Sequence, residues 1–120
     1  MNVNELRVGN YIDNNVECFQ IQAKDLIFLL AFDNEHYANP IPLTDNWIKN
    51  FGFKLGRYNH EGWIELDSLC LSEDRYSEGQ YRLGFDDSEY GVGEFTIKIK
   101  YVHQLQNIYF YSTGKELITK

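Results

Sequence analysis

Cationic and titratable side chains occur close together near the C-terminal end of the sequence, where aromatic residues are also frequent. They are Lys98, Lys100, His103 and Lys115. Capture of a nucleotide requires an aromatic face for the base and a few cations for the phosphate. These residues therefore suggest one candidate chemistry, the sequestration of a nucleotide signal without a reaction.

A second candidate is an interface around Phe110. If residues 102–113 form a helix, Phe110 projects away from its apolar side, next to His103, Gln106 and Asn107. An aromatic ring among hydrogen-bond donors and acceptors is typical of a contact surface, either for a partner protein or for a second copy of the chain. The alternative is that a neighbouring segment of the same chain covers the ring, because short α+β domains often bury a helix on two sides.

Motifs for catalysis or cofactor binding are missing from the sequence. The histidines at 36, 60 and 103 have no metal-ligand spacing, and the Gly-Val-Gly segment at 91–93 leads into a strand, not into the helix of a phosphate-binding loop. Carboxylate pairs abound between residues 61 and 94, but nothing singles out one pair for acid–base chemistry. We therefore expect no metal and no cofactor, and retain as an alternative a small hydrolase that uses one such pair.

The charge of the chain, −7 in total, is unevenly placed. Residues 61–94 carry two basic and ten acidic side chains, which gives −8, whereas four lysines and one glutamate give residues 95–120 a charge of +3. An acidic surface repels phosphate backbones, so general nucleic-acid binding is not expected. The acidic middle suits a basic partner, although such charges often serve only to keep exposed loops soluble.

The cysteines and the N-terminal segment bear on the compartment. Cys18 and Cys70 have no companions at metal-ligand spacing and are expected to be reduced, buried thiols. The first ten residues lack the basic and apolar regions of a secretory signal, and no run of about 18 apolar residues occurs. We expect a cytoplasmic protein without a membrane span.

The C-terminal part predicts a strand that runs directly into a helix. Phe95, Ile97 and Ile99 alternate with polar residues, the period of a half-buried strand. From Tyr101 the apolar period becomes helical, and Gly114 suits the left-handed residue that ends a helix. We predict a helix at about 102–113 that packs on a sheet.

The middle of the chain predicts a short helix followed by a sheet. Thr44 is a good N-cap for a helix over Asp45–Phe51, and Gly52 suits its left-handed end. Polar, glycine-bearing loops then separate further strand candidates, which predict an antiparallel meander. The candidates span residues 53–58, 63–66, 69–71, 81–85 and 95–99.

The N-terminal part predicts three more strands, at residues 6–12 with a bend near Gly9 and Asn10, at 16–21 and at 26–32. The third reads LIFLLAF and is expected to be covered on both faces. The fold class is therefore α+β with a mainly antiparallel sheet. A length of 120 residues fits a single domain, with a soft division near residues 40–44.

Three segments together carry a resemblance: ELRVGNYI near the start, PIPLTDNWIKNFGF in the middle and IKYVHQLQNIYFYSTGKEL at the end. They resemble a family of small uncharacterised proteins from Bacteroidetes bacteria and their phages and prophages. The stretch KYVHQLQN…TG is the most specific part, and residues 56–94 lie outside the resemblance. The resemblance implies a mobile-element protein in the cytoplasm of a bacterial host, and it supplies no functional residues.

The leading hypothesis is a phage-type accessory protein that acts as a non-enzymatic binding module for a host protein or a small ligand. One alternative is an anti-defence protein that sequesters a nucleotide signal, and another is the small hydrolase. The candidate binding residues lie at the C-terminal end of the chain. They are Lys98, Lys100, His103, Gln106, Asn107 and Phe110.

Overall fold

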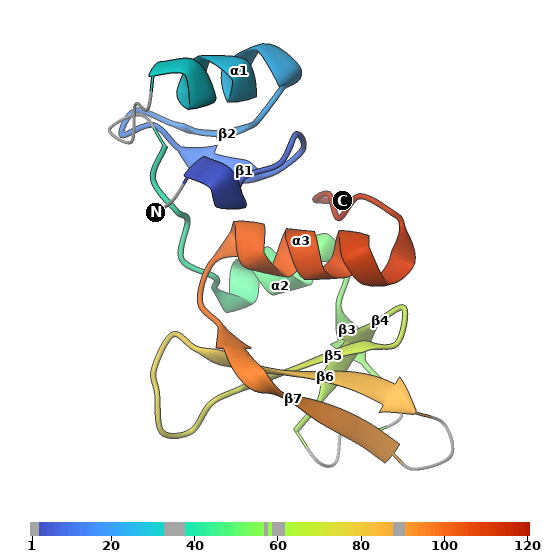
Figure 1. Ribbon diagram of the computed structural model, residues 1–120. Coiled ribbons are helices and arrows are strands. Elements are labelled where there is room, and N and C mark those ends of the chain that lie inside the picture. The colour runs from blue at the N-terminus through green and yellow to red at the C-terminus, as the bar shows by residue number, and fades with distance from the viewer. Residues whose placement is uncertain (1–2, 33–37, 57, 59–61, 88–90) are drawn as a thin grey trace. The chain divides into compact units, whose positions relative to one another are not determined.

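A computed structural model describes residues 3–32, 38–56, 58, 62–87 and 91–120 (Figure 1). The chain forms two compact units, one of residues 1–42 and 101–118 and the other of residues 43–100 and 119–120. The boundary between Pro42 and Leu43 falls within the stretch where the sequence indicated a soft division. That the two units make up a single domain stays a prediction.

The first unit combines short elements from both ends of the chain. Strands β1 and β2 pair antiparallel, with Ile12 opposite Phe19, and helix α3 contacts β1. Ile12, Ile21 and Leu29 are buried in its apolar core. Its elements are η1 (Val3–Glu5), β1 (Tyr11–Asp13), β2 (Cys18–Gln20), α1 (Ala23–Phe32) and α3 (Val102–Thr113).

The second unit is a helix followed by a five-stranded antiparallel sheet. The strands are hydrogen-bonded in chain order, which confirms the predicted meander. Leu69, Leu71, Leu83 and Ile99 are buried, and the Tyr81 hydroxyl donates a hydrogen bond of 3.1 Å to Asp45 Oδ1. The elements are α2 (Asp45–Phe51), β3 (Lys54–Leu55), β4 (Ile64–Leu66), β5 (Leu69–Glu73), β6 (Tyr81–Asp87) and β7 (Gly91–Ile99).

The α+β class and both predicted helices are confirmed. The Thr44 side chain accepts a hydrogen bond from the Trp47 amide at the start of α2, and Gly52 ends this helix with φ of 100°. Gly114 ends α3 with φ of 73°, and its amide donates to Phe110 O at 2.8 Å. The sequence offered no cap for the start of α3, where the Gln104 side chain accepts from the Tyr101 amide at 3.2 Å.

The predicted strand at residues 26–32 is wrong, because this segment lies in helix α1. A run that is apolar almost throughout has neither helical nor strand periodicity, so its pattern could not decide between the two. The local signal is at its start, where Asp25 Oδ2 accepts from the Gln22 amide at 2.9 Å, as a side chain in the first helical turn does. The expectation that both faces are covered is also wrong, since Ile27, Phe28 and Leu30 are exposed.

Two other strands differ from the prediction. Within residues 6–12 only Tyr11 and Ile12 lie in a strand, β1. Gly9 has φ of 99° and Asn10 Oδ1 accepts from the Arg7 amide at 2.6 Å, so the chain turns at the predicted bend and no strand precedes it within residues 6–10. In β7, Phe95 and Ile97 are exposed and only Ile99 of the predicted apolar face is buried. The strand register shifts, because Arg82 pairs with Lys98 but Gly84 pairs with Glu94. Only Leu83 of β6 therefore lies opposite residues 95–97 of β7.

Candidate functional site

Arg7 joins three parts of the first unit. Its terminal nitrogens donate to both carboxylate oxygens of Glu116, at 2.7 and 3.1 Å, and its Nε donates to Asn107 Oδ1 at 3.1 Å. The guanidinium carbon lies 4.2 Å from the centroid of the Phe110 ring. Phe110 is half-buried, so a neighbouring segment of the same chain covers part of this ring.

Gln106 and Asn107 hold backbone groups in place. The Gln106 amide donates to Gly9 O at 2.9 Å and Leu117 O at 3.0 Å, and its oxygen accepts from the Tyr11 amide at 2.8 Å. Asn107 donates to Glu5 O at 2.8 Å. The sequence placed Gln106 on an interface rim, but the structure buries it completely, and its bonds fix the folded backbone.

His103 is also buried, although the sequence placed it on an exposed helix face. The side chain is 1 % exposed, and Nε2 lies 3.3 Å from Glu5 Oε2. Its Nδ1 has no hydrogen-bond partner among the residues that the structure describes. Burial lowers the pKa of His103, and the bond to Glu5 opposes this shift. A phosphate group therefore does not reach this imidazole without displacing other residues.

Lys98 and Lys100 belong to the second unit, so the six predicted residues do not form one described cluster. The Lys98 ammonium lies 2.5 Å from Asp74 Oδ2. The hydrogen bond from Lys98, followed by that from the Tyr76 amide, holds the pKa of Asp74 below its usual value. Lys98 is thus already paired with a carboxylate, while Lys100 is exposed.

The acidic middle of the chain brings carboxylates together at one place. Glu73, Asp74, Arg75 and Glu78 line a pocket of about 370 Å³. The hydrolase alternative needs a carboxyl group with a raised pKa to act as the acid. Asp74 has the opposite shift and is paired with Lys98, so this carboxyl group does not meet that need.

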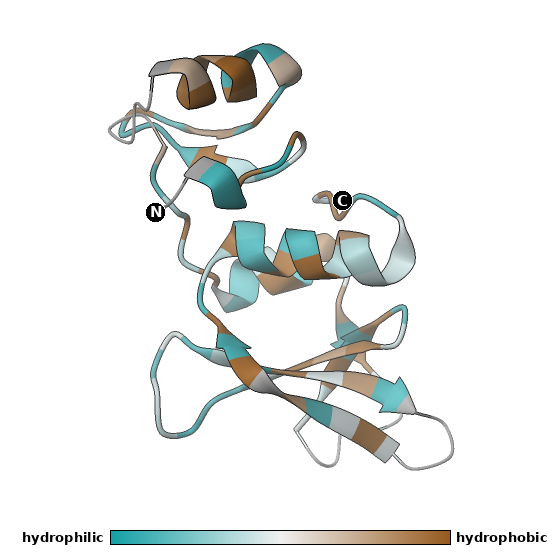
Figure 2. Cartoon of the chain, viewed as in Figure 1, coloured by the Kyte–Doolittle hydropathy of each residue, from teal (hydrophilic) through white to brown (hydrophobic). Residues whose placement is uncertain are grey.

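Helix α1 presents an apolar surface that the sequence reading missed. Ile27 is 66 % exposed, Phe28 47 % and Leu30 50 %, and Ala31 is also exposed. At about 100° per residue these four side chains share one arc, while Leu29 faces the core on the other side. Figure 2 shows the apolar colouring of this helix. The exposed arc of Ile27, Phe28, Leu30 and Ala31 is called the α1 face below.

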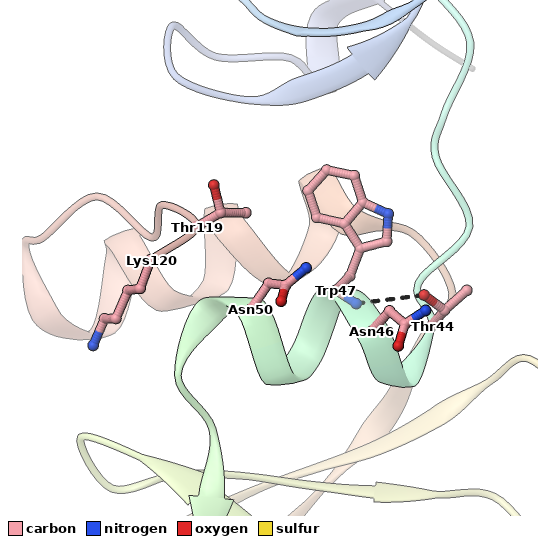
Figure 3. Close-up of a pocket in the computed structure, with 6 residues that line it drawn as sticks. All are labelled: Thr44, Asn46, Trp47, Asn50, Thr119 and Lys120. Carbon is pink, nitrogen blue, oxygen red and sulfur yellow. Dashed lines mark hydrogen bonds between the residues drawn. The ribbon is translucent and has the colours of Figure 1, made fainter.

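A second open feature lies beside α2 in the other unit. The pocket has a volume of about 420 Å³ and combines an indole, two amides, two hydroxyls and an ammonium group (Figure 3). The lining residues, which together are named the α2 pocket, are Thr44, Asn46, Trp47, Asn50, Thr119 and Lys120. None of the residues predicted from the sequence lines it.

The described residues also show what the chain offers for metal binding and for a membrane span. Within the described ranges, no three His, Cys, Asp or Glu side chains lie close enough together to hold a metal ion. No helix in the described part of the chain is long and apolar enough to cross a membrane. Both cysteines are free, but Cys18 is exposed, which corrects the expectation that it is buried.

Comparisons of the chain with protein-family models, with curated proteins and with solved structures gave no significant match. The α1 face, the α2 pocket and the charges around them are therefore the features of the chain that bear on its function.

Proposed function

We propose that this chain is a non-enzymatic binding module that engages a partner protein through the α1 face. The observation that carries the proposal is the exposure of Ile27, Phe28 and Leu30 on one side of a ten-residue helix. Large apolar side chains gathered on one exposed face are typical of protein contact surfaces. A phage-type accessory protein that acts on a host protein agrees with this use, and its cytoplasmic location is part of the same proposal.

The charge of the first unit argues for the chemistry of the partner. Residues 1–42 and 101–118 contain three basic and seven acidic side chains, a net charge of −4. Acidic surroundings disfavour a second, equally acidic copy and an anionic lipid surface, and they favour basic residues on a partner. The partner we propose is therefore a different protein that presents an apolar groove bordered by lysine or arginine.

The size of the α1 face sets how much it contributes to binding. Burying three side chains that are about half exposed contributes about 1 kcal/mol each. A micromolar complex requires about 8 kcal/mol. The face therefore supplies the centre of an interface, and basic residues of the partner must add polar contacts around it. Association should weaken with added salt, because those contacts are screened.

The experiment compares capture by matched variants. Immobilised wild-type chain, Phe28→Asp and Ile27→Asp are incubated with host lysate, and the captured proteins are quantified by mass spectrometry. Tyr76→Asp is the control, because Tyr76 is 94 % exposed and belongs to the other unit. We expect one basic protein whose capture falls at least tenfold with both α1 variants and not with the control. The purified pair should then bind directly, and more weakly at high salt.

Three outcomes would contradict the proposal. Capture that Phe28→Asp and Tyr76→Asp reduce equally would mean that the α1 face is not the contact. A wild-type mass near twice 14.2 kDa by light scattering, returning to 14.2 kDa in Phe28→Asp, would assign the face to self-association. Sedimentation with anionic phosphatidylglycerol vesicles, lost in the same variant, would assign it to a membrane surface.

A further inference from the structure

The α2 pocket holds a set of groups that recognises one class of small molecule. We infer that it binds a planar heterocycle that carries an anionic group, and a nucleoside monophosphate represents this class. The α2 pocket lies in the second unit and shares no residue with the α1 face. The two proposals can therefore be tested independently.

Trp47 supplies a fixed aromatic surface. Its ring centroid lies 5.7 Å from that of Phe51 with the planes tilted by 37°, and Phe51 is fully buried. The indole is therefore held by a core residue while it also lines the pocket (Figure 3). Stacking on such a ring suits any nucleobase, because every base has an aromatic face.

Asn46 and Asn50 supply groups that read the edge of a base. They are four residues apart on α2, so they lie on the same side of the helix one turn apart. Both are exposed, and the structure gives their side chains no hydrogen bond with another described residue. A primary amide donates and accepts at once, the pairing that asparagine uses for adenine.

Lys120 supplies the cation at the other wall of the pocket. Its amide donates to Asn50 O at 2.8 Å, which ties this residue to α2. Its side chain passes over Gly52, where an added Cβ would lie 2.9 Å from Lys120 Nζ. Lys120 is the one cation among the six lining residues, so a single phosphate is the matching charge. A volume of about 420 Å³ lies within the usual range for small-molecule sites.

The test titrates the whole chain with adenosine 5′-monophosphate and with adenosine. Calorimetry and tryptophan fluorescence follow binding, because Trp47 lines the pocket whereas Trp63 is buried. We expect the monophosphate to bind at least fivefold more tightly than the nucleoside. Adenosine 5′-triphosphate should gain little more, since a second cation is missing from the lining residues.

The variants assign each group. Lys120→Gln should weaken binding of the monophosphate about tenfold and leave that of adenosine almost unchanged. Asn50→Ala should weaken both, and Trp47→Leu should abolish both. Lys115→Gln is the matched control, because Lys115 is an exposed lysine that does not line the pocket. Phe28→Asp should leave nucleotide binding intact, which separates this test from that of the protein partner.

The inference is overturned by any of three results. The first is that none of the monophosphates of adenosine, guanosine, cytidine and uridine shows saturable binding up to 10 mM. The second is that Lys115→Gln and Lys120→Gln weaken binding of the monophosphate equally. The third is that Asn50→Ala and Lys120→Gln leave this binding unchanged. Circular dichroism checks that each variant is folded. Should Trp47→Leu unfold, the exposed residues Asn50 and Lys120 still decide the question.

Discussion

The guanidinium of Arg7 lies 4.2 Å from the centre of the Phe110 ring and at the same time binds both carboxylate oxygens of Glu116. One side chain thus joins the N-terminal segment to helix α3 and to the residues that follow it. Arg7 lies in ELRVGNYI, whereas Phe110 and Glu116 lie in IKYVHQLQNIYFYSTGKEL, two of the three segments on which the resemblance rests. In the structure, Arg7 contacts both Phe110 and Glu116, and these contacts stabilise the fold.

Replacing Arg7 by lysine should destabilise the protein by about 1–2 kcal/mol. Lysine keeps the charge but loses the paired hydrogen bonds and the flat contact with Phe110. Urea denaturation measures the change as a lower midpoint. Arg75→Lys is the control, because Arg75 is exposed on a loop. A midpoint equal to that of the control would mean that only the charge of Arg7 matters.

Gln106→Met should destabilise the protein more than Arg7→Lys does, by about 3 kcal/mol or more. Methionine has a similar size but leaves the Gly9 and Leu117 carbonyls and the Tyr11 amide without their present partner. Each buried polar group left unpaired costs about 1–3 kcal/mol. Gln104→Met, which removes the hydrogen bond from the Tyr101 amide at the helix start, should cost less than half as much, because Gln104 is not fully buried. Equal unfolding midpoints for the two variants would contradict this account.

Much of the fold could be predicted because helix ends and strand patterns depend on residues that are close together in the sequence. Thr44 and Gly52 act within one turn of α2, and Gly114 acts within one turn of α3. The meander followed from alternating residues and polar loops. Helix α1 was missed because LIFLLAF has no polar residue that marks a helical or a strand face.

Long-range contacts account for the rest. Arg7 and Glu116 are 109 residues apart, and no pattern in a single sequence pairs them. Helical periodicity predicted that His103 and Gln106 lie on the side of α3 opposite its apolar arc. It could not show that residues of the N-terminal segment cover this side. The α1 face could not be predicted for a related reason, because LIFLLAF has no periodicity that indicates a helix. The α2 pocket needs Lys120 beside Asn50, another contact that only the folded chain supplies.

Gly114→Val should lower stability by about 1–2 kcal/mol. Gly114 has φ of 73°, and apart from its chain neighbours no described residue would lie within 4 Å of a Cβ at this position, so the cost comes from the backbone conformation. Gly114→Asn is the control, since asparagine tolerates the left-handed region better. The thermal unfolding midpoint of Gly114→Asn should be higher than that of Gly114→Val. The reverse order would show that the backbone conformation is not the cause.

The two thiols should differ in reactivity. Cys18 is exposed, whereas Cys70 is buried, and burial, followed by the nearby charges of Glu65 and Asp86, raises its pKa to about 11. The reactive form of a cysteine is the thiolate, so Cys70 should be inert at pH 8. A thiol reagent should modify one site quickly in the native protein and two in urea. Cys18→Ser should abolish the fast phase, and two fast thiols in the native chain would contradict the burial of Cys70.

His103 should make stability depend on pH in a defined direction. Burial holds the pKa of this imidazole below its ordinary value of 6.5, although Glu5 partly opposes the shift. At pH values well above 6.5 the imidazole is neutral in both states, and its contribution to stability is complete. As the pH falls below that value, the unfolded chain takes up a proton that the native chain resists, so the free energy of unfolding decreases until the pH passes the folded pKa.

His103→Gln should therefore flatten this part of the pH profile. Glutamine does not titrate and can still donate a hydrogen bond to Glu5, so the comparison isolates protonation of the imidazole. Urea unfolding at half-unit steps from pH 7.5 to 5.5 measures the slope for both proteins. We expect the wild-type chain to lose more stability than the variant over this interval, because only the wild-type chain must keep a buried imidazole neutral. Parallel profiles would place the acid sensitivity on other groups, and a wild-type chain that gains stability on acidification would mean that Glu5, not burial, dominates the environment of His103.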